Sequence, residues 1–333
     1  MNINKDNSLN SLIQLSCRRE GEKTYLDDRY FDIPYKLTHY GNPLFTDYLE
    51  MILMSASPGI MEGDLLNLKV HCKKGAAMKF YTQSYNKIHQ MPHGKPAVQT
   101  CDYLLEDHAK LQYIPHPTIP YANSIFLAKN NIHLKKTSHL IWGDIISGGR
   151  IHSGERFALK SYHTQTKVFV DEKLILFDNQ KIEPETQPEE ELLFFEGYTH
   201  QGTLLIISKY ADDFKKELDE ILLEQFTDSD YGFTQCAENA LMIRIMSNSG
   251  DGIHDWLMNI GNMAWSFIEY KEKQDQKAQE MASEAEKEEQ NLVETQEEPK
   301  EIMAPEPKKT KAKTKNTAKK SSKDTKKKKK TNN

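Results

Sequence analysis

The sequence predicts a mainly β protein: a multi-stranded antiparallel or mixed β-sheet body, two amphipathic α-helices near the C-terminus, and a disordered tail. Three observations lead to this fold class. Short segments in which apolar and polar residues alternate fill most of the chain before residue 210, and a period of two is typical of strands with one buried face. Two later segments change to a helical period, and the apolar periodicity then stops from about Glu272.

The predicted strands come first along the chain. Residues 65–71 alternate clearly, with Leu66, Leu68 and Val70 on one face, and the segments 76–83 and 109–114 follow the same rule. The later runs "IHL", "KVFV", "LILF", "LLFF" and "TLLIIS" are rich in branched or aromatic residues. Gly, Asn, Asp and Pro separate these segments, as expected for turns between strands.

The two predicted helices lie at 211–226 and 252–270. In the second, apolar residues recur at steps of three and four, which gives a stripe wide enough for the core or for a partner. Asp251 precedes it and is a plausible N-cap. The apolar face of the first helix contains Phe214, Leu218, Ile221, Leu222 and Phe226, and that of the second contains Ile253, Trp256, Leu257, Ile260, Ala264, Phe267 and Ile268.

Composition divides the chain near residue 272. We expect residues 1–271 to form the β-rich body and 272–333 to form an acidic, then lysine-rich, mostly disordered tail, although the stretch to about Val293 could extend the last helix. Residues 275–306 contain 11 acidic residues and 3 lysines, and 308–330 contain 13 lysines and one aspartate. The overall charge of −5 therefore hides an acidic body, which argues against nucleic acid as its main ligand.

Several features of the sequence bear on location and redox state. The first residues lack the basic start and apolar stretch of a signal peptide, and no run approaches the roughly 18 apolar residues of a membrane span. The four cysteines, Cys17, Cys72, Cys101 and Cys236, are far apart and form no CxxC motif. These features predict a cytoplasmic protein with neither a disulfide framework nor a structural zinc site.

The sequence offers no recognisable catalytic motif. It contains no GxSxG and no HExxH, and Pro92 disfavours a helix that would join His89 and His93. We therefore expect no enzyme activity. Two alternatives stay open: a β-rich metalloenzyme with His71, His89 and Asp64 as ligands, and a nucleic-acid-binding protein that acts through non-specific contacts of its lysine tail.

Three aspartates deserve comparison. Asp64 follows "SASPGIMEG" at the entrance to a predicted strand, and Asp178 ends the run "LILF"; each is typical of a turn. Asp144 lies in the apolar segment "LIWGDIISGGR". A carboxylate in such surroundings needs buried partners or a cavity.

Five segments resemble the UreD/UreH family of urease accessory proteins. "SPGIMEGD" resembles its glycine-rich "GGLLGGD" segment, "TQSYNKIHQM" its "TQ…KVYR" strand, "IPHPTIPYANS" its proline-bounded segment, "LIWGDIISGGRIHSGERF" its "GR…GERF" motif, and "ALMIRIM" its "GLVVRVL" segment. The matches occur in order over roughly residues 25 to 270. "ASPGIMEGD", "TQSYNKIH" and "FEGYTH" are similar to the epsilonproteobacterial UreH form. Ser57 and Pro58 stand where the family usually has paired glycines.

The resemblance implies a scaffold for urease maturation. It implies binding to a UreF-like protein, through it to a UreG-like GTPase, and to the urease apoprotein, with a dimer inside the complex. It also implies delivery of nickel through an internal passage lined partly by acidic residues, with no tightly bound cofactor and only transient nickel. Transferred by motif, Asp64, Asp144 and Asp178 belong to this passage, and Gly59 and Gly63 would let the backbone approach it.

Overall fold

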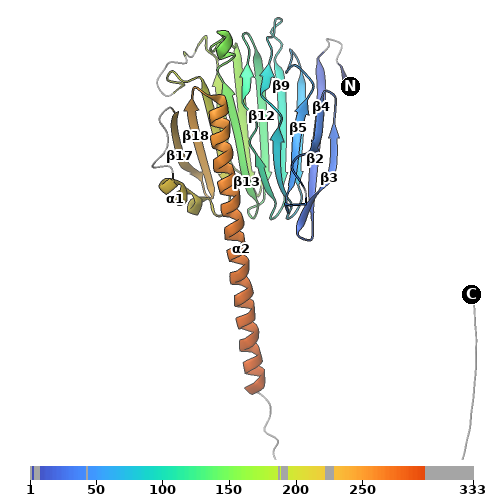
Figure 1. Ribbon diagram of the computed structural model, residues 1–333, viewed down its shortest axis with the longest axis vertical. Helices are drawn as coiled ribbons and strands as arrows, with labels where there is room; N and C mark the ends of the chain where they lie inside the picture. Colours follow the sequence, from blue (N-terminus) through green and yellow to red (C-terminus); the bar gives the residue numbers. More distant parts are fainter. Residues whose placement is uncertain are drawn as a thin grey trace, which may run out of the picture. The chain divides into compact units, whose positions relative to one another are not determined.

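Two β-sheets lie face to face in the computed structural model, which describes residues 2–3, 8–42, 44–186, 188, 194–221 and 229–296 (Figure 1). In sheet A the strand order is β3–β2–β6–β9–β12–β14–β15, and β1 also pairs with β2. Its strands are β1 (Asn2–Ile3), β2 (Leu9–Glu20), β3 (Lys23–Phe31), β6 (Leu65–Cys72), β9 (Ala97–Leu105), β12 (Ile125–Leu134), β14 (Ser161–Val170) and β15 (Lys173–Ile182).

Sheet B has the order β17–β18–β16–β13–β10–β7–β5–β4, and the short strands β8 and β11 join it beside β13. A short 3₁₀ helix, Ile151–Ser153, follows β13. The strands of sheet B are β4 (Tyr35–His39), β5 (Leu49–Ser55), β7 (Ala77–Thr82), β8 (Asn86–Ile88), β10 (Lys110–Tyr113), β11 (Thr118–Pro120), β13 (His139–Ser147), β16 (His200–Ile207), β17 (Ser229–Ala237) and β18 (Ala240–Ser247).

The centre of each sheet is parallel and its edges are antiparallel. From β5 to β14 the chain moves back and forth between the sheets, so that neighbours within one sheet run in the same direction. Parallel neighbours need such a crossover connection, which here is a strand of the opposite sheet. The mainly β prediction with a mixed sheet is confirmed, and the segments predicted at 65–71, 76–83 and 109–114 form β6, β7 and β10.

The run "LLFF" was expected to be a strand, and the structure corrects this for its described part. Phe194 and Phe195 lie in a turn, and the first two residues of the run lie outside the described residues. Phe195 is buried and packs edge-on against Phe157, with ring centroids 4.6 Å apart. Apolar packing at the end of the sandwich, rather than strand pairing, therefore explains the aromatic composition.

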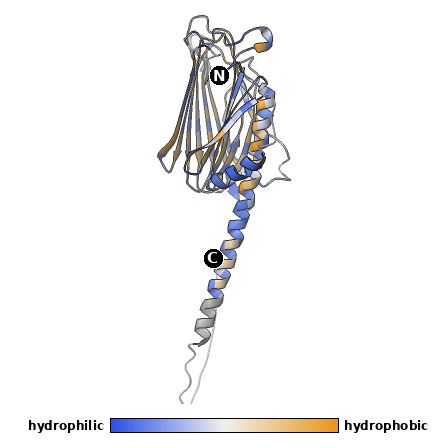
Figure 2. Ribbon diagram, turned by 90° about the vertical axis from the view of Figure 1, so that its left-hand side faces the viewer, coloured by the Kyte–Doolittle hydropathy of each residue, from blue (hydrophilic) through white to orange (hydrophobic). Residues whose placement is uncertain are grey.

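Apolar side chains from both sheets interdigitate to form the central core, which includes Leu68, Tyr103 and Ile132 from sheet A and Met78 and Leu111 from sheet B. Figure 2 shows the two layers of strands from the side, with α2 against one of them. All four cysteines are free thiols, and three of them are buried in this core region. No described helix has the length and apolar character needed to cross a membrane.

Two helices cover the outer face of sheet B: α1 (Ala211–Ile221) and α2 (Gly250–Gln296). Phe214 of α1 and Trp256 and Leu257 of α2 pack with apolar residues of β13, β16 and β18. An added Cβ at Gly202 would lie 2.5 Å from Ile253, so α2 approaches β16 as closely as a glycine permits. Of the residues predicted to extend the first helix, Leu222 and Phe226 lie outside the described residues.

The helix α2 is longer than the segment 252–270 in which the helical period was recognised. Ser249 is the N-cap, because its hydroxyl accepts the Gly252 N–H at 3.0 Å, and Asp251 instead accepts a hydrogen bond from Tyr85. The helix continues past residue 270 to Gln296, consistent with the extension that composition allowed. The compact unit that contains the sheets extends to Lys277. The lysine-rich segment lies outside the described residues.

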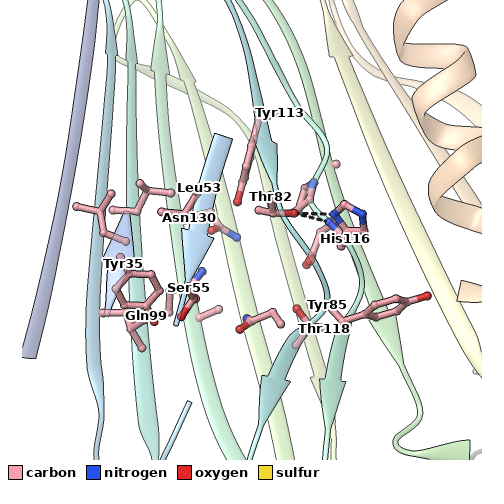
Figure 3. A pocket seen from close by; sticks show the side chains of 18 of the residues that line it. Tyr35, Leu53, Ser55, Thr82, Tyr85, Gln99, Tyr113, His116, Thr118 and Asn130 are labelled. Atoms are coloured by element: carbon pink, nitrogen blue, oxygen red, sulfur yellow. Dashed lines mark hydrogen bonds between the residues drawn. The ribbon is translucent and has the colours of Figure 1, made fainter. Parts of the chain in front are cut away.

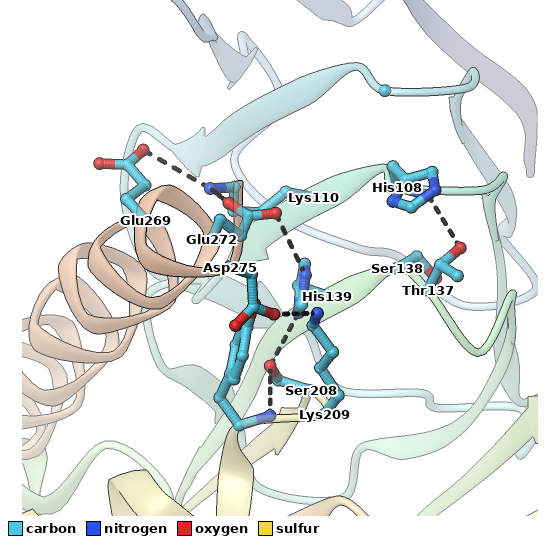
Figure 4. A network of polar contacts seen from close by, with 12 residues as sticks. His108, Lys110, Thr137, Ser138, His139, Ser208, Lys209, Glu269, Glu272 and Asp275 are labelled. Atoms are coloured by element: carbon cyan, nitrogen blue, oxygen red, sulfur yellow. Dashed lines mark hydrogen bonds and ion pairs between the residues drawn. The ribbon is translucent and has the colours of Figure 1, made fainter. Parts of the chain in front are cut away.

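A buried polar network explains why the body includes residues beyond 271 (Figure 4). Lys110 of β10 lies under α2 with its Nζ 2.9 Å from Glu272 Oε2 and 3.6 Å from Glu269 Oε1. His139 of β13 lies 3.3 Å from Glu272 Oε1, and Asp275 pairs with Lys209 at 2.5 Å. The last turns of α2 before residue 278 are therefore bound to sheet B by charge as well as by apolar contact.

Candidate functional site

A cavity of about 150 Å³ lies between the two sheets (Figure 3). Tyr35, Ser55 and Gln99 gather toward one end of the view, and Tyr85 and His116 lie at the other. Both sheets supply its polar lining, which includes Asn67, Thr82, Asn130, Tyr113, Thr118, Asp144, Tyr162 and Thr164. This volume has room for several water molecules.

Asp144 is placed in the cavity by the alternation of β13. Ile141 and Ile145 pack toward the helices, whereas Trp142 and Ile146 face the interior. Asp144 has the same orientation as Trp142 and is one of the lining residues. Its side chain borders the cavity and is half-buried. Of the two settings expected for this carboxylate, buried partners or a cavity, the structure shows the cavity.

The environment of Asp144 opposes its ionisation. Burial, together with the negative charge of Asp178, raises the pKa of Asp144 to about 6. Above that pH the cavity contains a carboxylate that pairs with no basic side chain of the described chain. A negative charge held in this way favours a mobile cation.

Water inside the cavity is expected from an unsatisfied group in its wall. Thr164 Oγ1 is buried and makes no hydrogen bond to any described residue. Buried polar atoms nearly always have a partner, from protein or from water. The wall therefore requires water.

The lining hydroxyls stay protonated at neutral pH. Burial, together with the charge of Asp144, raises the pKa values of the Tyr113 and Tyr162 hydroxyls well above the ordinary tyrosine value. Burial also raises the pKa of the nearby Cys101 thiol to about 12. The cavity therefore offers neutral oxygen ligands around one carboxylate and no thiolate.

Asp178 lies near Asp144, but it belongs to the open edge of the sandwich. It is on β15, the edge strand of sheet A, and its Oδ1 lies 2.7 Å from Arg244 Nη2 on β18 of sheet B. The structure thus brings two of the three predicted aspartates close enough to interact, with Asp178 half-buried and paired with a cation.

Asp64 occupies a different environment. Its two carboxylate oxygens accept the backbone N–H groups of Leu9 and Met61, each at 2.8 Å, and it is almost fully buried. It does not line the cavity, although its charge contributes to a raised pKa of Tyr35, whose main cause is burial. This geometry supports a structural role in holding the "SASPGIMEGD" loop.

The glycines of that loop are explained by close backbone packing. An added Cβ at Gly59 would lie 2.5 Å from the Lys87 carbonyl oxygen, because the loop pairs with β8 through a bridge between Ile60 and Ile88. Gly63 has a positive φ of 75°, a conformation that glycine adopts without strain. The close approach is thus to β8 rather than to the cavity.

The ligands of the alternative metalloenzyme are not brought together. His71 binds Glu106 at 2.8 Å, and His89 lies 3.2 Å from the Pro58 carbonyl oxygen. In the described chain, no group of three or more His, Cys, Asp or Glu side chains is arranged to hold a metal ion. The oxygen-rich cavity is thus suited to weak, exchangeable contacts with a cation rather than to storage.

Sequence reasoning missed most of the cavity lining. Gln99, Asn130 and Thr164 are polar residues at inward-facing positions of strands in sheet A. A signal was present, since Asn130 has the same phase as the buried Ala128 and Ile132. A polar residue in the apolar phase of a strand indicates either a buried partner or a wet cavity.

Comparison with known proteins assigns the family. A family model described as "UreD urease accessory protein" matches residues 10–276. The chain belongs to the UreD family of urease accessory proteins. This confirms the resemblance found in the sequence motifs, and the family region ends one residue before the end of the compact unit.

Individual relatives agree with this assignment. The chain is 35% identical over 255 residues to the urease accessory protein UreD of Acetivibrio thermocellus, covering 77% of this chain and 97% of that protein. It is 30% identical over 259 residues to UreD of Flavobacterium johnsoniae, with 77% and 92% covered. It is also 31% identical over 183 residues to the urease accessory protein UreH of Helicobacter pylori, with 55% and 68% covered.

Proposed function

We propose that this protein acts in urease maturation as a non-enzymatic scaffold of the nickel-insertion machinery. Membership of the UreD family supports the urease connection. The observation that supports a part in nickel handling is the wet cavity with the unpaired carboxylate of Asp144. We propose further that the protein is cytoplasmic and joins a UreF-like protein, a UreG-like GTPase and the urease apoprotein in a complex in which it is dimeric.

Nickel conduction would use Asp144 inside the cavity and Asp178 beside it. A conduit must attract Ni²⁺ without holding it, and imidazole or thiolate clusters bind this ion tightly. One carboxylate, neutral hydroxyl and amide oxygens, and water give weaker and faster-exchanging contacts. Asp64 has both oxygens engaged by backbone amides, so we assign it to the stability of its loop and expect no direct contact with nickel.

The test is the nickel content of urease matured by Asp144→Asn. This substitution keeps the volume and removes the charge, so the variant should still co-purify with UreF-like and UreG-like partners after co-expression. The urease it matures should contain several-fold less nickel per active site, measured by elemental analysis. Asp102→Asn is a matched control, because Asp102 lies on the outer face of sheet A and binds Asn131 at 2.9 Å; it should leave the nickel content unchanged.

Two results would count against this function. Normal nickel content with the Asp144→Asn variant would remove the cavity carboxylate from the pathway. Failure of the wild-type protein to co-purify with the partners would remove the scaffold role itself.

A further inference from the structure

Sheet B is interrupted at the level of Asp144. β13 pairs with β10 as far as Trp142 and with β11 at Ile146. Between these points β13 has, in the described chain, a ladder partner only on its other side, in β16. In the next position of the sheet, β7 likewise ends before β8 begins. The two breaks lie side by side and leave a window in the sheet, beside the cavity carboxylate.

Two segments of different character cross this window. In the segment 114–117, Pro115 and Pro117 have no N–H to continue the hydrogen-bond ladder of the sheet. The Ile114 side chain packs tightly on both sides: an added Cβ would lie 3.1 Å from it at Gly143 and 2.7 Å from it at Gly261. This segment is fixed between β13 and α2. Residues 83–85 lie between strands, and Gln83 and Ser84 are exposed, so this segment has fewer restraints.

Side chains close the window. Thr82 Oγ1 accepts the His116 N–H at 2.9 Å and lies 3.0 Å from His116 Nδ1 (Figure 3). The His116 ring stacks on His254 of α2, with centroids 4.2 Å apart. Tyr85 lies over the same place and donates its hydroxyl hydrogen to Asp251 in the first turn of α2.

We propose that this window is the port through which a divalent cation reaches the cavity, and that Tyr85 is its gate, held shut by Asp251. The inference rests on the proposed function for the identity of the cation, and on the geometry of sheet B for the port. Three exposed residues line the cavity, Ser55, Gln83 and Ser84, and two of them directly precede Tyr85. Rotation of Tyr85 breaks one hydrogen bond to Asp251 and no strand pairing.

The chemistry at the port suits the passage of a cation. Asp251 is exposed at the entrance. Release of Tyr85 opens the way past it to the imidazole of His116 in the wall and to the carboxylate of Asp144 behind. These groups provide successive single contacts, and no three of them form a chelating site. A cation attracted by the outer carboxylate can therefore move inward without being trapped.

The experiment measures access to the cavity directly. Thr164→Cys places a thiol in the cavity wall, at a hydroxyl that has no described partner. The reporter chain, in complex with its co-expressed partners, is treated with cationic aminoethyl methanethiosulfonate, and the rate of modification at residue 164 is followed by peptide mass spectrometry. The readout needs no urease activity and distinguishes residue 164 from the native cysteines.

Added to the reporter, Tyr85→Phe should raise the modification rate about tenfold, because it removes a hydrogen bond to a charged group and keeps the ring. Tyr30→Phe is the matched control, because the Tyr30 hydroxyl donates a hydrogen bond to Asp32 at 2.8 Å on an exposed strand of sheet A. Loss of this hydrogen bond should leave the modification rate at residue 164 unchanged. An anionic sulfonatoethyl reagent should react more slowly than the cationic one, and Asp144→Asn should reduce this difference, because only the carboxylate of Asp251 at the entrance then remains.

An unchanged rate in Tyr85→Phe, or an equal rise in Tyr30→Phe, would overturn the gate. Thermal unfolding of each variant shows whether a faster rate reflects general loosening, which would also count against it. The proposed function fails separately: Asp144→Asn with normal urease nickel would refute nickel conduction while leaving the labelling result intact.

Discussion

The carboxyl group of Asp144 is subject to two opposing requirements. Its charge makes the cavity attractive to a cation, yet burial beside Asp178 makes that charge costly for the folded protein. The carboxylate of Asp64, by contrast, accepts hydrogen bonds from two backbone amides. The sequence places Asp64 at a turn and Asp144 in an apolar segment. The structure gives Asp64 a structural role, and it leaves Asp144 in the cavity wall without a basic partner among the described residues.

The cost of Asp144 can be measured through its pH dependence. The folded-state pKa of about 6 lies above the ordinary 3.8, so the destabilisation is absent near pH 3.8 and below, grows as the pH rises, and is complete above about pH 6. Asp144→Asn should therefore raise the free energy of unfolding at about pH 7.5 by roughly 1–3 kcal/mol and have little effect near pH 4. Urea denaturation at both pH values is the measurement. A gain of the same size at both would show that charge is not its cause.

At the scale of elements, α2 combines an apolar stripe with buried charge. Lys79 and Lys110 are almost fully buried beneath it, where Lys79 Nζ donates to Asn262 Oδ1 at 2.9 Å and Lys110 binds Glu272. Partial burial of Glu272 opposes its ionisation, but bonds from His139 and Lys110 outweigh this and lower its pKa to about 2. These pairs fix the register of α2 on sheet B, which an apolar stripe alone leaves free to slide.

The apolar stripe of α2 serves the core of the body. Trp256 is 8% exposed and packs 5.4 Å from the Tyr231 ring, whereas Met263 of the same helix is 36% exposed. Trp256→Ala should lower the free energy of unfolding by about 3–5 kcal/mol, and Met263→Ala should change it by no more than about 0.5 kcal/mol. Chemical denaturation of both variants tests this. A stable, soluble Trp256→Ala protein that has lost only its partner would show that the stripe is an interface.

At the scale of the whole molecule, the compact unit that contains the sheets extends to Lys277. The helix α2 is continuous across Lys277. The acidic composition therefore begins, near residue 272, before the packing of the helix against the body ends. Glu272 and Asp275 belong to the acidic segment by composition and to the body by their contacts with Lys110 and Lys209. The family match, which ends at residue 276, agrees with the structural boundary.

Two truncations separate these boundaries. Removal of residues 278–333 should leave stability and partner binding intact, because the described ion pairs that bind α2 to the body lie at or before Asp275. Removal of residues 272–333 deletes Glu272 and leaves the buried Lys110 with only the more distant Glu269, which should cost about 2–4 kcal/mol. Thermal unfolding and co-purification with partners compare the two chains. If the two truncated chains were equally stable, the polar network of Figure 4 would not contribute to the stability of the body.

The sequence by itself determined the mainly β character, the presence of two amphipathic helices and the family, and it singled out Asp144 as a carboxylate in apolar surroundings. These depend on local periodicity and on short motifs, which neighbouring residues settle. The anomaly of a carboxylate among isoleucines and a tryptophan is likewise visible within one strand.

Tertiary structure decided the rest. Alternation in β7 and β10 indicated one apolar face, but the sequence could not show that Lys79, Lys110 and Gln112 on the other face would lie under α2. It also could not show which strands pair in parallel, that Asp64 binds Leu9, or that breaks in two neighbouring strands coincide beside Asp144. Each of these is a contact between segments distant in the chain, and such contacts are selected by the packing of the whole sandwich rather than by the preferences of any one segment.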